Sequence, residues 1–265
     1  MIARANAHLP LRALLPVFGR QARSQVKSVT SLASSAYSAD DTAPSVRINS
    51  ASTAGASTPK LGTASTPCLS PHDRLLLSQM LRVDHAGEVA ANTIYEAQAD
   101  VFRRLGDSQT EQLMLEMWST EKKHLRVVTD ILRQHRVTPS KLLPVWSAAG
   151  SLLGGVTALL GKEAAMACTE AVETVIGEHY DDQLDHLSSL VNQNDASSRD
   201  AGFPHEGVDP SLPLLSSVIK EFRDDELEHL DTAVENDAQQ APAHALLSAV
   251  VGWGCRAAIQ VAGRY

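Results

Sequence analysis

Cysteine and aromatic residues are scarce in this chain of 265 residues. The three cysteines, Cys68, Cys168 and Cys255, are widely spaced and form no Cys-x-x-Cys pair. This odd, scattered set argues against a disulfide framework and against a thiolate metal site, and it favours a reducing compartment. Aromatic residues make up only 4% of a chain that is rich in Ala and Leu, which favours helices over a sheet.

Positive charge is also in short supply. The 23 Lys and Arg residues are outnumbered by 31 Asp and Glu residues, which gives a net charge of −8. No basic stripe is available to bind a phosphate backbone. We therefore expect no nucleic acid among the partners.

Acid, in turn, is absent from residues 1–39, which carry basic residues among serines and apolar side chains: Arg4, Arg12, Arg20, Arg23 and Lys27. This composition is typical of a mitochondrial transit peptide, and the alternative is a basic tail with no targeting role. Residues 40–71 are rich in Ser, Thr, Ala and Pro without a helical period, so we interpret them as a disordered linker. The folded domain is expected at residues 72–265.

Four long segments show helical periodicity. The first follows a cap at Ser70 or Asp73 and ends before Gly106, and the second covers about 108–135. The third runs from Lys162 to about Leu190, and the fourth carries an apolar stripe from Leu215 to Ala233. Asn192 to Pro213 is predicted to be a loop. The fold class is therefore all-α, a four-helix bundle.

Two further segments, 142–161 and 243–262, are strongly apolar. The first has 20 uncharged positions, enough to cross a bilayer, but crossing would separate the candidate site residues described next. It is either a buried crossover helix or a surface that meets a membrane or a greasy substrate. The second is either a fifth core helix or another interfacial element.

The sequence Glu-x-x-His occurs twice, at Glu121/His124 and at Glu226/His229, and this spacing puts both side chains on one helix face. Glu88 and Glu173 each lie in the middle of the apolar stripe of the preceding helix. Four-helix carboxylate proteins build two-metal sites from this pattern. Surface Glu–Lys and Glu–His pairs would explain one motif, but not two motifs together with two glutamates in apolar stripes.

Four carboxylates and two imidazoles suit two ions of iron or manganese, with open positions for dioxygen. Asp225 could orient an imidazole of a neighbouring helix, and Asp84 could orient the other. His179 and Tyr180 lie within two turns of Glu173 and are candidate catalytic residues, with a structural hydrogen-bonding role as the alternative. His85 is expected outside the ligand set.

Four motifs carry a resemblance to a known family: Arg82 to Glu88, Gly161 to Cys168, Glu178-His179-Tyr180, and Phe222 to His229. They resemble the demethoxyubiquinone hydroxylase family of ubiquinone biosynthesis, over about residues 72–265. The resemblance implies a ferritin-like di-iron fold with a crossover helix and a C-terminal apolar helix. It implies the ligand set Glu88, Glu121, His124, Glu173, Glu226 and His229.

In activity, the resemblance implies ring hydroxylation of a polyprenyl benzoquinol by dioxygen, with NADH as electron source. It implies the matrix face of the mitochondrial inner membrane, a lipid-binding partner protein and other ubiquinone-biosynthesis enzymes; a homo-oligomer remains open. No nicotinamide-binding fingerprint is present, and the loop before the fourth helix looks longer than is usual. The alternatives are a ferritin-like iron oxidase or storage protein and a non-catalytic helical assembly factor.

Overall fold

The computed structural model describes residues 69–200 and 211–265, with the backbone alone for 193–200. These residues form helices and turns and contain no strand, which confirms the all-α prediction. The predicted transit peptide and nearly all of the predicted linker lie outside the described residues.

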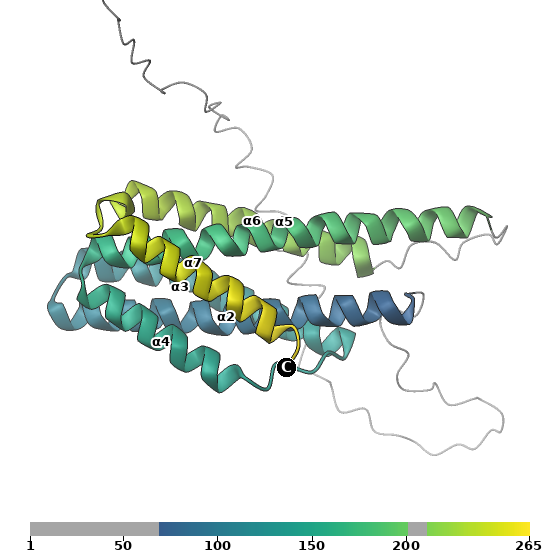
Figure 1. Cartoon of the computed structure of the whole chain (residues 1–265), viewed down its shortest axis with the longest axis horizontal. Helices are drawn as coiled ribbons and strands as arrows, with labels where there is room; N and C mark the ends of the chain where they lie inside the picture. The colour runs from purple at the N-terminus through teal and green to yellow at the C-terminus, as the bar shows by residue number, and fades with distance from the viewer. Residues whose placement is uncertain (1–68, 201–210) are drawn as a thin grey trace, which may run out of the picture.

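Four long helices make the bundle: α2 (Pro71–Leu105), α3 (Ser108–His135), α5 (Lys162–Asp200) and α6 (Ser211–Glu235). They run along the long axis of the molecule, and two shorter helices cross them obliquely (Figure 1). These are α4 (Leu143–Leu159), between the two helix pairs, and α7 (His244–Ala262), which follows a 3-10 turn, η2 (Ala238–Gln240).

The first helix pair is fixed by local signals at its ends. The Ser70 side chain accepts a hydrogen bond from the Asp73 N–H and caps α2, with Pro71 in the first turn. Gly106 ends the helix at φ 77°, a left-handed conformation that glycine adopts without strain. Asp107 then caps α3. The tight turn makes α2 and α3 an antiparallel hairpin.

Two apolar clusters fill the bundle, one towards each end. One contains residues of the first half of α2 and the second half of α3, such as Leu81 and Ile131, with Leu187 and Phe222 from the other pair. The other contains the opposite halves: Phe102, Met114, Met117 and Met166. The predicted site residues occupy the level between the two clusters.

α4 packs on α2 through small residues. A Cβ added at Gly154 would collide with the carbonyl group of Ile94, and one at Gly150 would collide with Ala90 and Thr93. Several large apolar side chains of α4 nevertheless face outward, and Leu152 is 68% exposed. α4 is therefore a crossover helix on the surface, not a buried one.

α7 is likewise mostly exposed, including Trp253 at 78%. By length and composition it is apolar enough to cross a membrane, and only 17% of its apolar window is buried. α7 is therefore not the fifth core helix considered above, because most of its apolar surface is exposed.

A loop was predicted from Asn192 to Pro213, and both of these bounds are wrong. α5 continues to Asp200 because no glycine or proline interrupts the polar run before Gly202. α6 begins at Ser211, with Pro213 in its first turn, where the missing N–H would have had no partner in the helix.

Candidate metal centre

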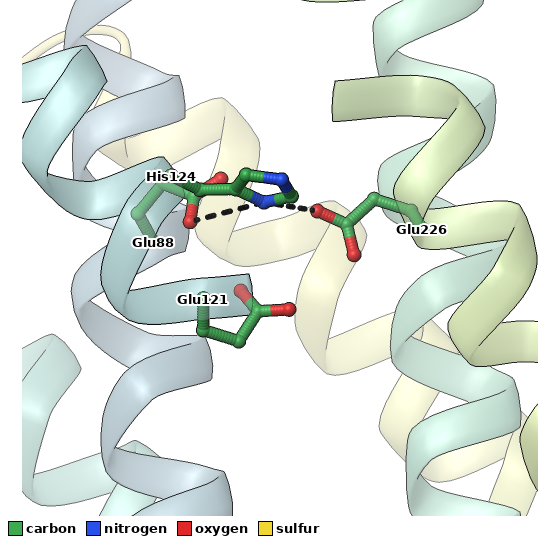
Figure 2. A group of neighbouring side chains, drawn as sticks. All are labelled: Glu88, Glu121, His124 and Glu226. Atoms are coloured by element: carbon green, nitrogen blue, oxygen red, sulfur yellow. Dashed lines mark ion pairs between the residues drawn. The ribbon is translucent and has the colours of Figure 1, made fainter. Parts of the chain in front are cut away.

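The six predicted ligands come together inside the bundle, and none is more than 5% exposed. They form two overlapping groups in which one ligand atom per residue lies within 4.8 Å of the others. The first is Glu88, Glu121, His124 and Glu226 (Figure 2), and the second is Glu121, Glu173, Glu226 and His229. Glu121 and Glu226 belong to both groups, which is the arrangement expected of carboxylates that bridge two cations. We call the six side chains the Glu/His cluster.

Each histidine faces carboxylates of both helix pairs. His124 Nδ1 lies 3.2 Å from Glu226 Oε1 and 3.9 Å from Glu88 Oε2. His229 Nδ1 lies 3.0 Å from Glu121 Oε1 and 3.3 Å from Glu226 Oε2. The i, i+3 spacing on α3 and α6 thus places each histidine beside the shared glutamates.

Electrostatics within the Glu/His cluster are dominated by burial. Burial, with the charges of neighbouring glutamates, raises the pKa of Glu88 and Glu173 well above the usual range and also raises the pKa of Glu121. Burial opposes ionisation of Glu226 too, but the ion-pair contacts with His124 and His229 outweigh it and lower its pKa to about 2. Against the same effect of burial, Glu121 and Glu226 raise the pKa of His229 to about 11. In the absence of metal, bound protons therefore offset the negative charge of the glutamates, which cations would offset in the metal-loaded protein.

The unsatisfied atoms of the cluster fit a pair of divalent cations. Several buried atoms have no hydrogen-bond partner: Glu88 Oε2, both Glu121 carboxylate oxygens, His124 Nδ1, Glu226 Oε2 and His229 Nδ1. Each buried polar atom left unpaired costs about 1–3 kcal/mol. Oxygen and imidazole ligands of this kind would hold iron or manganese and remove that cost.

Two aspartates were expected behind the histidines, and one of the two predictions is correct. Asp225 Oδ2 lies 3.0 Å from His124 Nε2, as expected for a group that orients the ring. The prediction for Asp84 is wrong. Asp84 accepts a hydrogen bond from the Gln183 amide and lies 3.4 Å from His179 Nε2, because its position on α2 faces α5 and not His229 on α6.

Two tyrosines form hydrogen bonds to the single glutamates of α2 and α5, and each tyrosine comes from the other of these two helices. Tyr180 on α5 donates a hydrogen bond of 2.8 Å to Glu88, and Tyr95 on α2 donates one of 2.6 Å to Glu173. Sequence analysis named Tyr180 but assigned no role to Tyr95. The missed signal is the spacing, since each tyrosine follows the glutamate of its own helix by seven residues, or two turns.

A largely apolar cavity lies against the Glu/His cluster. Small residues of α2 form one wall, and residues of α4, α5 and α7 form the rest, including Trp146, Ile176, Cys255 and Ile259. Glu88, Glu121, Glu173 and Glu226 also line it, as do Asp84, His179 and Tyr180. An apolar molecule in this cavity would therefore contact the carboxylates directly. His85 lies outside both ligand groups, as expected.

Comparisons with known proteins agree with this geometry. A family model described as "Ubiquinone biosynthesis protein COQ7" matches residues 75–262. The "NADPH-dependent 3-demethoxyubiquinone 3-hydroxylase, mitochondrial" of Rattus norvegicus is 42% identical over 193 residues, 73% of this chain and 80% of the relative. The "5-demethoxyubiquinone hydroxylase, mitochondrial" of Saccharomyces cerevisiae is 39% identical over 196 residues, 74% of this chain and 81% of the relative.

A bacterial relative is similar to the same extent. The "3-demethoxyubiquinol 3-hydroxylase" of Rhodospirillum rubrum is 38% identical over 194 residues, 73% of this chain and 81% of the relative. The match covers nearly all of the described bundle, from Leu75, in the second turn of α2, to Ala262 at the end of α7. The chain therefore belongs to the COQ7 family of ubiquinone biosynthesis proteins.

Proposed function

We propose that this protein is a di-iron hydroxylase that adds an oxygen atom from dioxygen to the ring of a polyprenyl demethoxybenzoquinol. The observation that carries the proposal is the pair of ligand groups sharing Glu121 and Glu226 beside an apolar cavity. The relatives named above supply the substrate class, since their names are those of demethoxyubiquinone or demethoxyubiquinol hydroxylases.

The reaction replaces a ring C–H bond with C–OH. The second oxygen atom leaves as water, which consumes two electrons and two protons. When bound, the two iron ions would supply the redox chemistry that activates dioxygen. We propose a reduced nicotinamide as electron source: the family resemblance implied NADH, whereas the name of the rat relative specifies NADPH.

The chain's own residues would bind and orient the quinol. The apolar walls exclude water and hold the ring against the Glu/His cluster, and the polyprenyl tail would leave towards the exposed faces of α4 and α7. His179 lines the cavity beside the buried Asp84, and Tyr180 lines it with its hydroxyl group on Glu88. We assign these two residues to contacts with the ring, with His179 as a hydrogen-bond partner of a ring oxygen.

We further propose that the protein acts at the matrix face of the mitochondrial inner membrane, after removal of residues 1–39. The names of the rat and yeast relatives include the word mitochondrial. The exposed apolar residues of α4 and α7 would contact the lipid surface, or the lipid-binding partner protein that delivers the quinol.

Substitutions that place a negative charge on the exposed apolar surface of α4 and α7 test the proposed membrane contact. Leu152→Glu and Trp253→Glu change side chains that are 68% and 78% exposed, whereas Leu153 packs against the core and is less suitable. We expect both variants to lose flotation with liposomes while retaining metal. Leu105→Glu, 63% exposed at the last residue of α2 and outside both apolar helices, is the control. Equal flotation of all variants would remove the proposed membrane contact.

The activity is tested with iron-loaded protein, dioxygen and a short-chain demethoxyquinone, with NADH and NADPH compared as donors. Mass spectrometry should show a product heavier by one oxygen atom. Glu226→Gln, which changes a shared carboxylate, should abolish it, and Glu228→Gln, two residues away and exposed, should not. Bound iron without product, in a sample that sizes as a large closed shell, would instead support the iron-storage alternative.

A further inference from the structure

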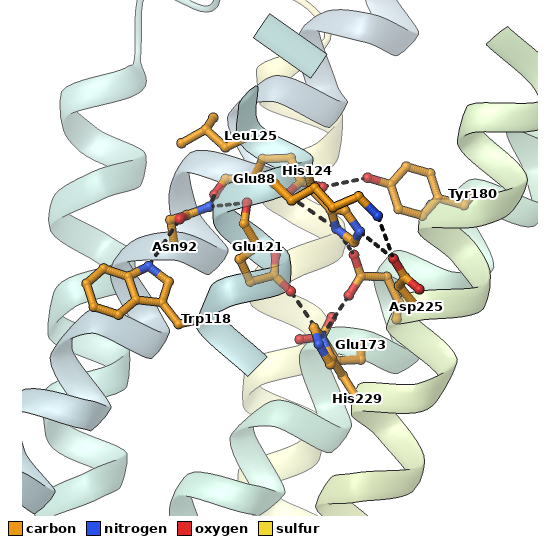
Figure 3. Close-up of polar contacts among 12 residues, drawn as sticks. Glu88, Asn92, Trp118, Glu121, His124, Leu125, Glu173, Tyr180, Asp225 and His229 are labelled. Atoms are coloured by element: carbon orange, nitrogen blue, oxygen red, sulfur yellow. Dashed lines mark hydrogen bonds and ion pairs between the residues drawn. The ribbon is translucent and has the colours of Figure 1, made fainter. Parts of the chain in front are cut away.

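Asn92 is a buried amide one turn after Glu88 on α2, and its contacts are with backbone atoms of the Glu/His cluster (Figure 3). Its Nδ2 group donates one hydrogen bond to the carbonyl oxygen of Glu88 and one to that of Glu121, each 2.9 Å long. Those two residues come from different helices, and their carboxylates meet in one ligand group. Asn92 therefore ties together the backbones that carry two proposed ligands.

Trp118 fixes the orientation of this amide. The indole Nε1–H on α3 donates a 3.1 Å hydrogen bond to Asn92 Oδ1, so the amide nitrogen must face the two carbonyl groups. On its outer side the indole ring is covered by Lys122, whose Nζ lies 4.0 Å from the ring centroid. Both amide protons and the amide oxygen are thus used, which offsets the cost of burying a polar side chain.

Among the described residues, the second helix pair shows no such contact. The position one turn after Glu173 on α5 is Gly177, where an added Cβ would meet Leu227 at 3.7 Å. The two halves of the bundle match in their glutamates, histidines and crosswise tyrosines but differ at this position. Gln98 is another buried amide on α2, but its partners lie outside the Glu/His cluster, whereas Asn92 binds the backbone of two proposed ligands.

We propose that Asn92, oriented by Trp118, is a positioning residue that sets the spacing of Glu88 and Glu121 and hence the geometry of the metal site. The inference rests on the proposed metal centre. Loss of the amide would let α2 and α3 shift along each other at this level, which would change the coordination of both cations without removing any ligand.

The test is a titration of the metal-free full chain with Co²⁺, followed by visible absorption, in wild type, Asn92→Leu, Trp118→Phe and Gln98→Leu. Leucine keeps the number and branching of the side-chain heavy atoms of asparagine but makes no hydrogen bond. Gln98 is the matched control, because it is a buried amide on the same helix whose partners, Thr157 and Ala165, lie outside the cluster.

We expect Asn92→Leu to bind Co²⁺ about 10- to 100-fold more weakly and with altered d–d bands. Trp118→Phe should change the bands in the same direction to a smaller extent, and Gln98→Leu should give the wild-type spectrum. If Asn92→Leu does not fold, Trp118→Phe carries the test. Wild-type bands and affinity in the Asn92 and Trp118 variants would overturn the role of Asn92, whereas a wild type that binds no Co²⁺ would overturn the metal centre itself.

Discussion

Single residues around the Glu/His cluster hold its members in place without belonging to it. Asp225 contacts His124, Tyr95 contacts Glu173 and Tyr180 contacts Glu88. All three contacts join one helix pair to the other. Each therefore couples the position of a proposed ligand to the packing of the two pairs, which makes these residues sensitive points for metal binding.

Asp225→Asn should weaken metal binding although it changes no proposed ligand. The amide keeps the size of the carboxylate but not the charge that stabilises and orients the His124 ring. We expect about 10- to 100-fold lower affinity for Mn²⁺ or Fe²⁺. Metal competition assays on purified protein measure it. Asp224→Asn, which breaks only contacts with Lys220 and Arg223 on the surface, should leave the affinity unchanged; an equal loss in both variants would contradict this role of Asp225.

Tyr95→Phe and Tyr180→Phe form a matched pair. Each leaves a buried carboxyl group without its hydrogen-bond donor, so each should lower the free energy of unfolding by about 1–3 kcal/mol in urea titrations. Their effects on turnover should differ, because Tyr180 lines the cavity and Tyr95 is absent from its lining. We expect the larger loss of turnover in Tyr180→Phe at equal iron content. Equal losses would reduce Tyr180 to the orienting role of Tyr95.

The long helices and the two apolar helices have different roles. α2, α3, α5 and α6 carry the Glu/His cluster, while α4 and α7 close the apolar cavity and present exposed leucines and Trp253 outward. α4 can do both because its glycines seat it directly on the backbone of α2. The same helix in a less tightly packed position would leave a wider opening above the cavity.

Gly154→Ala tests this seat. The added methyl group would overlap the Ile94 carbonyl, so we expect the free energy of unfolding to fall by about 1–3 kcal/mol. The neighbouring Gly155→Ala meets no atom within 4 Å and should stabilise the helix by up to about 1 kcal/mol. Thermal melts of the two variants should therefore move in opposite directions. A shift in the same direction would show that α4 is not held by this contact.

The sequence predicted the existence of the helices better than their bounds and their burial. Apolar composition located the two shorter segments, and periodicity located the four long helices, since their apolar stripes are local signals. It misplaced the end of α5, because a polar run without glycine or proline resembles a loop in composition. It left the burial of α4 open, since which face of an apolar helix is covered depends on its neighbour. The contact of Asp84 with Gln183 and His179 depends on how α2 and α5 are rotated, which no spacing within one helix specifies.

For the molecule as a whole, the Glu/His cluster links stability to pH and to metal. In the metal-free protein the raised pKa values of Glu88 and Glu173 mean that the folded state binds more protons than the unfolded chain above the usual glutamate range. Its stability should therefore fall as pH rises through those values. The pKa of His229, raised to about 11, acts in the same direction, since its contribution is complete below the ordinary histidine pKa and is lost towards pH 11. Glu226, with a pKa of about 2, stays ionised in this window.

Metal binding has the opposite dependence, because the cations replace those protons. We expect the increase in melting temperature caused by Mn²⁺ to be larger at about pH 8 than at about pH 5.5. Calorimetry of metal-free and metal-loaded protein at the two pH values measures it. Glu173→Gln, which keeps a neutral side chain at all pH values, should reduce the difference. An increase that is the same at both pH values would show that the buried carboxylates do not exchange protons for metal.

The seat of α4 on α2 has a mechanical consequence. Gly150 faces Ala90, two residues beyond Glu88, and Gly154 faces Ile94 one turn further on. The backbones of the two helices are in direct contact here, with no flexible side chains between them that could adjust to a displacement. A displacement of α4, caused by contact at its exposed leucines, should therefore displace α2 as well. Because α2 carries Glu88 and Asn92, the outer surface and the metal site are mechanically coupled.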